Sequence, residues 1–178
     1  MIRAIALVVS VYVAVIAQDF IPAMPFFGGA PVLLVPVIVC YGLLWLPFPG
    51  ALAFALYAGL LGDLAMLHAD GDRVEIGLGW SMLYYVLLAA VLNLPHWPVS
   101  GRRWETHCLA SGGATFFLLA GQYIMVCLRR QSFVLDGGVF AHIAGPAVAA
   151  LLLAPLVYFF FGLFPDRGFR RRAGRVAR

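Results

Sequence analysis

The chain has 178 residues, of which 63% are hydrophobic and 11% charged, and its mean hydropathy is +0.96. A water-soluble globule of this size needs far more polar surface, so the composition excludes one and indicates an integral membrane protein. All twelve basic residues are arginines, the formal net charge is +4, and half of the arginines lie in the last twelve positions. Such a cluster indicates a cytoplasmic segment first and a contact with anionic lipid second.

A helix that crosses a bilayer needs about twenty mostly apolar residues. The chain offers about six apolar runs, near residues 2–17, 31–45, 50–67, 77–94, 106–128 and 138–164. The expected fold class is therefore all-α: a polytopic membrane bundle of about six transmembrane helices. We expect one domain over residues 1–164 and a basic cytoplasmic tail over residues 165–178.

The first run follows Arg3 and could also be a secretory signal peptide, with Val15-Ile16-Ala17 as a cleavage-like site. Because further apolar runs follow at once, an uncleaved first helix is the favoured interpretation. The break after the second run contains Pro47 and Pro49, and two prolines so close predict a tight reversal. The last run is long and holds two further prolines, which predicts a tilted or kinked helix.

Arginine placement indicates the orientation of these crossings. Six crossings put both termini on one side of the membrane, and we assign that side to the cytoplasm. Nine arginines then lie inside (Arg3, Arg102, Arg103 and the six of the tail) and three outside (Arg73, Arg129, Arg130). This excess agrees with the positive-inside rule. The pair Arg129-Arg130 does not fit this rule, because it falls on the outer side. The two side chains could snorkel from a helix end to the interface, or the fifth crossing could be misplaced.

Asp63 is the most informative residue, because it lies inside the apolar segment Ala58-Gly59-Leu60-Leu61-Gly62-Asp63-Leu64. A carboxylate at membrane depth costs about 2.5–3.5 kcal/mol on insertion scales, so it needs a role. Three interpretations are open. Asp63 could pair with a basic or hydroxyl group of the bundle, bind a substrate or ion, or cap a helix start near an interface.

Two glycines accompany this acid. Gly59 and Gly62 lie about one helical turn apart, and without side chains they allow another backbone to approach the face beside Asp63. We therefore predict that both glycines are structural or partner-contact residues. A partner would be another membrane protein that packs helix against helix.

Other polar side chains are less specific. His142 lies in the sixth run without a second His or Cys at metal-ligand spacing, so a helix–helix hydrogen bond is favoured over a metal site. Gln122 must find a partner inside the bundle. His107 lies near a predicted helix end, where solvent exposure is expected.

The three cysteines, Cys40, Cys108 and Cys127, form no C-x-x-C pair, and we interpret them as small core residues.

The sequence lacks the enzymatic motifs G-x-S-x-G, H-E-x-x-H and a P-loop lysine. We therefore expect no enzymatic activity, no cofactor, no metal and no nucleic-acid partner. A small membrane enzyme would need paired acid and base groups facing one cavity, and only Asp63 and His142 are deep enough to be candidates.

Three segments resemble the MreD family, the small polytopic subunit of the bacterial rod-shape (elongasome) machinery. They are Pro31-Val32-Leu33-Leu34 at the opening of the second helix, Tyr57-Ala58-Gly59-Leu60-Leu61-Gly62-Asp63-Leu64, and Gly77-Leu78 at the opening of the next helix. The resemblance is strongest over residues 31–92. Pro31, Gly59, Gly62, Asp63 and Gly77 are its candidate structural or partner-contact residues.

The resemblance implies a non-enzymatic inner-membrane protein that binds the shape protein MreC and couples cytoskeletal filaments to peptidoglycan synthases. MreD-like proteins also look like the substrate-binding (S-component) subunits of energy-coupling-factor vitamin transporters, which supplies the alternative function. Such a transporter subunit should have a polar, aromatic-rich pocket that is reachable from outside the cell.

Overall fold

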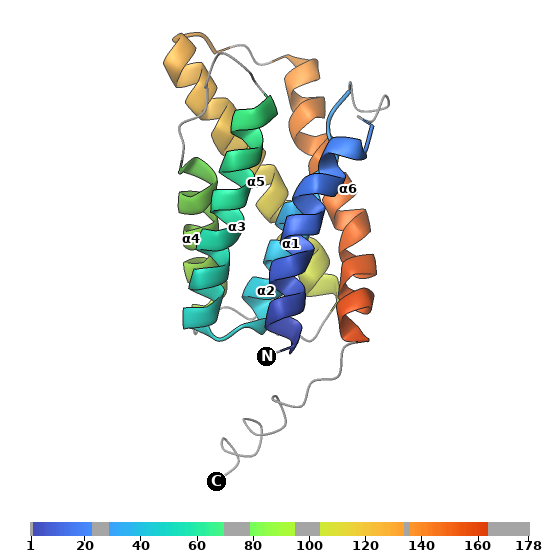
Figure 1. Ribbon diagram of the computed structural model, residues 1–178. Helices are drawn as coiled ribbons and strands as arrows, with labels where there is room; N and C mark the ends of the chain where they lie inside the picture. The colour runs from blue at the N-terminus through green and yellow to red at the C-terminus, as the bar shows by residue number, and fades with distance from the viewer. Residues whose placement is uncertain (1, 23–28, 70–78, 95–103, 134–135, 164–178) are drawn as a thin grey trace.

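We describe the protein from a computed structural model that covers residues 2–22, 29–69, 79–94, 104–133 and 136–163 (Figure 1). These residues form six α-helices and no strand. The helices are α1 (Ile2–Phe20), α2 (Val35–Trp45), α3 (Phe48–Ala69), α4 (Trp80–Leu92), α5 (Trp104–Arg130) and α6 (Gly137–Gly162). The predicted all-helical membrane bundle is confirmed, and each helix falls within or close to one of the six apolar runs.

Four helices, α1, α3, α5 and α6, are long and apolar enough to cross a bilayer. The helices α2 and α4 have only 11 and 13 residues, which corresponds to roughly 16 and 20 Å at about 1.5 Å per residue. A hydrocarbon core is about 30 Å thick. Four of the six helices therefore have the length that a full crossing needs. Helices α2 and α4 are too short to span the hydrocarbon core by themselves.

The short helix α2 lies at the centre of the bundle, where it contacts α1, α3, α5 and α6. Nine of its eleven residues are buried. A helix that is apolar all round belongs in an interior, and the sequence Val-Pro-Val-Ile-Val-Cys-Tyr-Gly-Leu-Leu-Trp has no polar face. Around it, α3 pairs with α4 and α5 pairs with α6, and α1 begins at the same end of the bundle at which α6 ends (Figure 1).

The second helix begins later than the sequence predicts. Pro31 does not open it: residues 31–34 are not helical, and α2 begins at Val35. The first turn contains Pro36, whose missing N–H is needed by no helical bond at that position. The side-chain oxygen of Gln18 accepts the N–H groups of Leu34 at 2.8 Å and Val35 at 3.0 Å. These bonds from the end of α1 satisfy two donors that the helix cannot.

The predicted tight reversal is confirmed, because α2 ends at Trp45 and α3 begins at Phe48. Helix α6 continues through Pro146 and Pro155 without interruption. Helix α5 confirms the fifth run and carries Arg129 and Arg130 in its last turn. The predicted tail, residues 165–178, lies outside the described residues.

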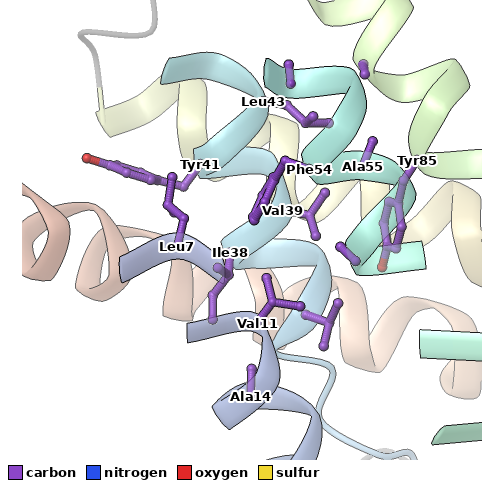
Figure 2. Packing of buried hydrophobic residues seen from close by; sticks show 14 of the residues in the cluster. Leu7, Val11, Ala14, Ile38, Val39, Tyr41, Leu43, Phe54, Ala55 and Tyr85 are labelled. Atoms are coloured by element: carbon purple, nitrogen blue, oxygen red, sulfur yellow. The ribbon is translucent and has the colours of Figure 1, made fainter. Parts of the chain in front are cut away.

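The hydrophobic core draws most of its residues from the first four helices (Figure 2), and Leu118 of α5 and Phe161 of α6 also belong to it. Its labelled members are Leu7, Val11 and Ala14 from α1, Ile38, Val39, Tyr41 and Leu43 from α2, Phe54 and Ala55 from α3, and Tyr85 from α4. The Phe54 ring packs against Gly42, where a β-carbon would collide with it. Because α1 places buried side chains in this core, the favoured interpretation of the first run as a bundle helix agrees with the packing.

Candidate functional site

Asp63 lies near the end of α3 and is buried, with 6% of its surface exposed. One carboxylate oxygen accepts the backbone N–H of Gly79 at 2.7 Å, and the other accepts that of Ser81 at 3.1 Å. Helix α4 begins between them, at Trp80. The carboxylate therefore caps α4, the helix that follows its own helix in the chain.

The cap explains how an acid can be buried here. The first N–H groups of a helix have no partner within the helix, and the partial positive charge at the helix start attracts an anion. Gly79, the N-cap residue of α4, has φ +102° and no side chain that could supply the cap. Asp63 fills that vacancy from another helix. Of the three interpretations, capping a helix start is the one that the structure shows.

The glycines beside Asp63 have different surroundings. A β-carbon on Gly59 would lie 2.6 Å from the backbone nitrogen of Met82, so α4 packs directly on this glycine. A β-carbon on Gly62 would meet only Ser81, at an ordinary 3.9 Å. Helix α4 of the same chain therefore occupies the face of Gly59, which is a structural contact within the bundle. A contact of either glycine with a partner stays a prediction. Close approach of another backbone, the reason for the prediction, is correct.

Two predicted residues stand apart from this contact. Pro31 is exposed in the non-helical residues before α2. Gly77 lies outside the described residues. The structure thus brings together Gly59, Gly62 and Asp63 at the junction of α3 and α4.

A cavity of about 110 Å³ lies beside the capped start of α4. All of the first five helices or their ends contribute to it. Its polar lining residues are Gln18, Asp19, Ser81, Tyr85 and Gln122, and its apolar lining is formed by Leu33, Val35, Pro36, Gly62, Ala65 and Leu118. No motif in the sequence predicts this group, because its members come from separate runs.

Gln122 is one of these lining residues and is 92% buried, since 8% of its surface is exposed. The prediction that it finds a partner inside the bundle is wrong within the described residues, where its amide makes no hydrogen bond and borders the cavity instead. Tyr84, about one turn after the start of α4, does join two helices: its hydroxyl donates to the Ala114 carbonyl of α5 at 2.6 Å.

A second polar group lies at the other end of the bundle. His107, at the start of α5, is 1% exposed, so the expected solvent exposure is wrong. The ring of Tyr41 meets it edge-on at 5.5 Å between centroids, and Tyr158 lies at 6.1 Å. Neither ring nitrogen of His107 has a hydrogen-bond partner in the described residues. Aromatic side chains from α2 and α6 cover this histidine. Its position near the end of an apolar run could not predict this burial.

The remaining candidates have local roles. His142 is exposed, and its Nδ1 lies 3.0 Å from the Gly138 carbonyl of its own helix. The predicted helix–helix bond is therefore wrong, and His142 does not meet Asp63. Cys40, Cys108 and Cys127 are free and buried, which confirms their assignment to the core. Within the part of the chain that the structure describes, no group of three or more His, Cys, Asp or Glu side chains could hold a metal ion.

Comparison with protein-family models, with curated proteins and with solved structures finds no match to this chain.

Proposed function

We propose that this chain is a non-enzymatic integral membrane subunit of the bacterial cell-shape (elongasome) machinery. It binds an MreC-like membrane partner and helps to organise the cell-wall (peptidoglycan) synthesis complex. The proposal starts from the resemblance of residues 31–92 to the MreD family, a stretch that covers α2, α3 and α4. These three helices include the centre of the bundle.

The bonding of Asp63 is the observation that carries this proposal. An intramembrane acid suggests transport or catalysis by default. Here both carboxylate oxygens are bonded to the start of α4, at 2.7 and 3.1 Å, and the glycine one turn earlier packs on the same helix. In the segment that resembles the family, Asp63 therefore has a structural role, because it caps the start of α4. That use favours a scaffold over a catalyst.

The lateral surface of the bundle supports a partner within the membrane. Large apolar side chains are exposed along α1, including Ile5, Val9, Tyr12 and Val13, and others are exposed along α5 and α6. Such faces suit lipid tails and the single helix of a bitopic partner equally well. Partner binding through helix contacts needs no soluble domain.

For the location we propose the bacterial inner membrane, with both termini cytoplasmic. The nine-to-three division of arginines favours this orientation. The start of α1 and the end of α6 lie at the same end of the bundle, as an even number of passes requires (Figure 1). Anionic lipid is the proposed contact of the arginine-rich tail.

The alternative, a substrate-binding subunit of an energy-coupling-factor-type vitamin transporter, is favoured by one observation, the cavity beside the start of α4, whose mainly apolar lining includes five polar side chains. Its size argues against a vitamin. Pockets for ligands of drug size occupy about 300–1,000 Å³, and this cavity has about 110 Å³. This cavity is therefore too small for a vitamin, and the scaffold remains our first proposal.

A complementation experiment tests the proposal. The chain, together with the MreC-like protein of its own source, replaces the corresponding pair in a rod-shaped bacterium, and cell width is measured by microscopy. Restored rods support the proposal. An Asp63→Leu chain should restore them poorly, and a Ser81→Ala chain, which keeps the backbone N–H that Asp63 accepts, is the control that should restore them fully. Round cells despite normal membrane levels of both wild-type proteins would contradict the proposal.

A further inference from the structure

We propose that the cavity beside the Asp63 cap is a binding site for a small protonated amine. This inference is independent of the cell-shape function. The cavity, defined by its eleven lining residues, lies between the end of α1, the start of α2, the end of α3, the start of α4 and the middle of α5.

Two buried polar side chains point to a ligand. Tyr85 is 2% exposed and Gln122 is 8% exposed, and both line the cavity. Among the described residues no hydrogen bond joins either side chain to another group, and both residues border the cavity. Buried polar groups are nearly always satisfied, because an unmade bond costs about 1–3 kcal/mol. Their missing partner therefore belongs in the cavity.

Two neighbouring pairs of lining residues come from α4 and α5. Ser81 and Tyr85 lie one turn apart on α4, and Leu118 and Gln122 lie one turn apart on α5. Side chains spaced by four residues share a helix face. The helices α4 and α5 contact each other sparsely, whereas α4 packs closely on α3. The cavity lies where these two faces meet the ends of α1 and α3 and the start of α2.

The charge of the lining selects a cation. Asp19, an exposed carboxylate at the end of α1, is one of the lining residues, and no Lys, Arg or His is among them. An anion would be drawn to the positive start of α4, but the carboxylate of Asp63 already occupies that position. The Gln122 amide oxygen, the Tyr85 hydroxyl and the Asp19 carboxylate can all accept hydrogen bonds. An ammonium group, which only donates, matches this set.

The size of the cavity limits the amine. A water molecule needs about 10–15 Å³ of such space, so 110 Å³ admits a molecule of several heavy atoms. Methylammonium or ethylammonium fits that description. A bulky quaternary ammonium fits neither the volume nor the need for N–H donors.

The test is a binding titration on the purified full-length chain in lipid nanodiscs. Ethylammonium is added as its chloride, and binding is followed by calorimetry, with ethanol as the neutral analogue and tetraethylammonium as the bulky one. We expect saturable binding of ethylammonium alone. Saturable binding of ethanol with equal affinity, or no saturable binding of ethylammonium at millimolar concentrations, would overturn the proposal.

Variants locate the site. Tyr85→Phe removes only the hydroxyl and should raise the dissociation constant about tenfold, as loss of a hydrogen bond to a charged group does. Tyr12→Phe, on the exposed face of α1, is the matched control and should leave it unchanged. If Tyr85→Phe does not fold, the exposed Asp19→Asn variant decides, with a weaker affinity and a loss of salt dependence expected. Wild-type affinity in the folded Tyr85→Phe chain, or in Asp19→Asn where that variant decides, would overturn the proposal.

Discussion

The carboxylate of Asp63 on α3 accepts the backbone N–H of Ser81, in the first turn of α4, at 3.1 Å. Together with its bond to Gly79, this contact fixes the start of one helix to the end of another. The acid that looks most functional in the sequence is therefore a connection between two helices. Its removal should affect the stability of the bundle before it affects any chemistry.

Replacing Asp63 tests this connection. Asp63→Leu leaves the buried N–H of Ser81 and the part-buried N–H of Gly79 without acceptors, and should lower the free energy of unfolding by about 2–4 kcal/mol. Asp63→Asn keeps one acceptor oxygen and should cost about half as much. Stability in mixed micelles, measured by denaturant titration, checks both values. Ser81→Ala is the control, because Asp63 bonds only the backbone there; a wild-type stability of Asp63→Leu would rule out the cap.

The two glycines of α3 should respond differently to the same substitution. Gly59→Ala places a methyl group 2.6 Å from the backbone nitrogen of Met82, so α3 and α4 must separate. Gly62→Ala meets Ser81 at 3.9 Å and gains about 1 kcal/mol of helix propensity. We expect a loss of thermal stability for Gly59→Ala and none for Gly62→Ala. Equal effects in the two variants would show that close packing on Gly59 is unimportant.

Gln18 should matter for the start of α2. Gln18→Leu removes the oxygen that accepts the N–H groups of Leu34 and Val35, and should cost about 1–2 kcal/mol, as the loss of a helix cap does. Hydrogen exchange at these two amides, followed by mass spectrometry, should become faster. Asp19→Asn changes the neighbouring side chain without touching the bond and serves as control. Unchanged exchange in Gln18→Leu would contradict the cap.

His107 should be replaceable. Its ring nitrogens have no partner in the described residues, and Tyr41 packs edge-on against the ring. His107→Phe keeps an aromatic ring and removes two unsatisfied polar atoms, so the thermal stability should stay the same or rise. His142→Phe, on the exposed surface of α6, is the control for added hydrophobicity. A large loss of stability in His107→Phe alone would reveal a partner for the imidazole.

Hydropathy was sufficient to predict the six helices, because each apolar run in this chain is bounded by prolines, glycines or charges. It placed the start of α2 too early, at Pro31, because the cap from Gln18 is a contact between residues sixteen positions apart in the chain. Sequence could likewise show that Asp63 needs partners but not that they are the first amides of α4. Residue spacing carries no information on which helix end lies beside which side chain.

The burial of His107 and the cavity lined by Tyr85 and Gln122 were beyond prediction for the same reason. His107 lies near the end of an apolar run, and the rings of Tyr41 from α2 and Tyr158 from α6 pack against it in the fold. Tyr85 and Gln122 belong to different helices, and each alone is an ordinary polar residue in an apolar run. Their common cavity is a property of the packing.

The most direct measurement of the proposed scaffold function is co-purification. The chain and the MreC-like protein of its own source are expressed together, and a tag on the chain is used to isolate it in mild detergent. We predict that the partner is recovered in a stoichiometric complex that survives size-exclusion chromatography. A wild-type chain that is folded and monodisperse but recovers no MreC-like protein would contradict the scaffold function.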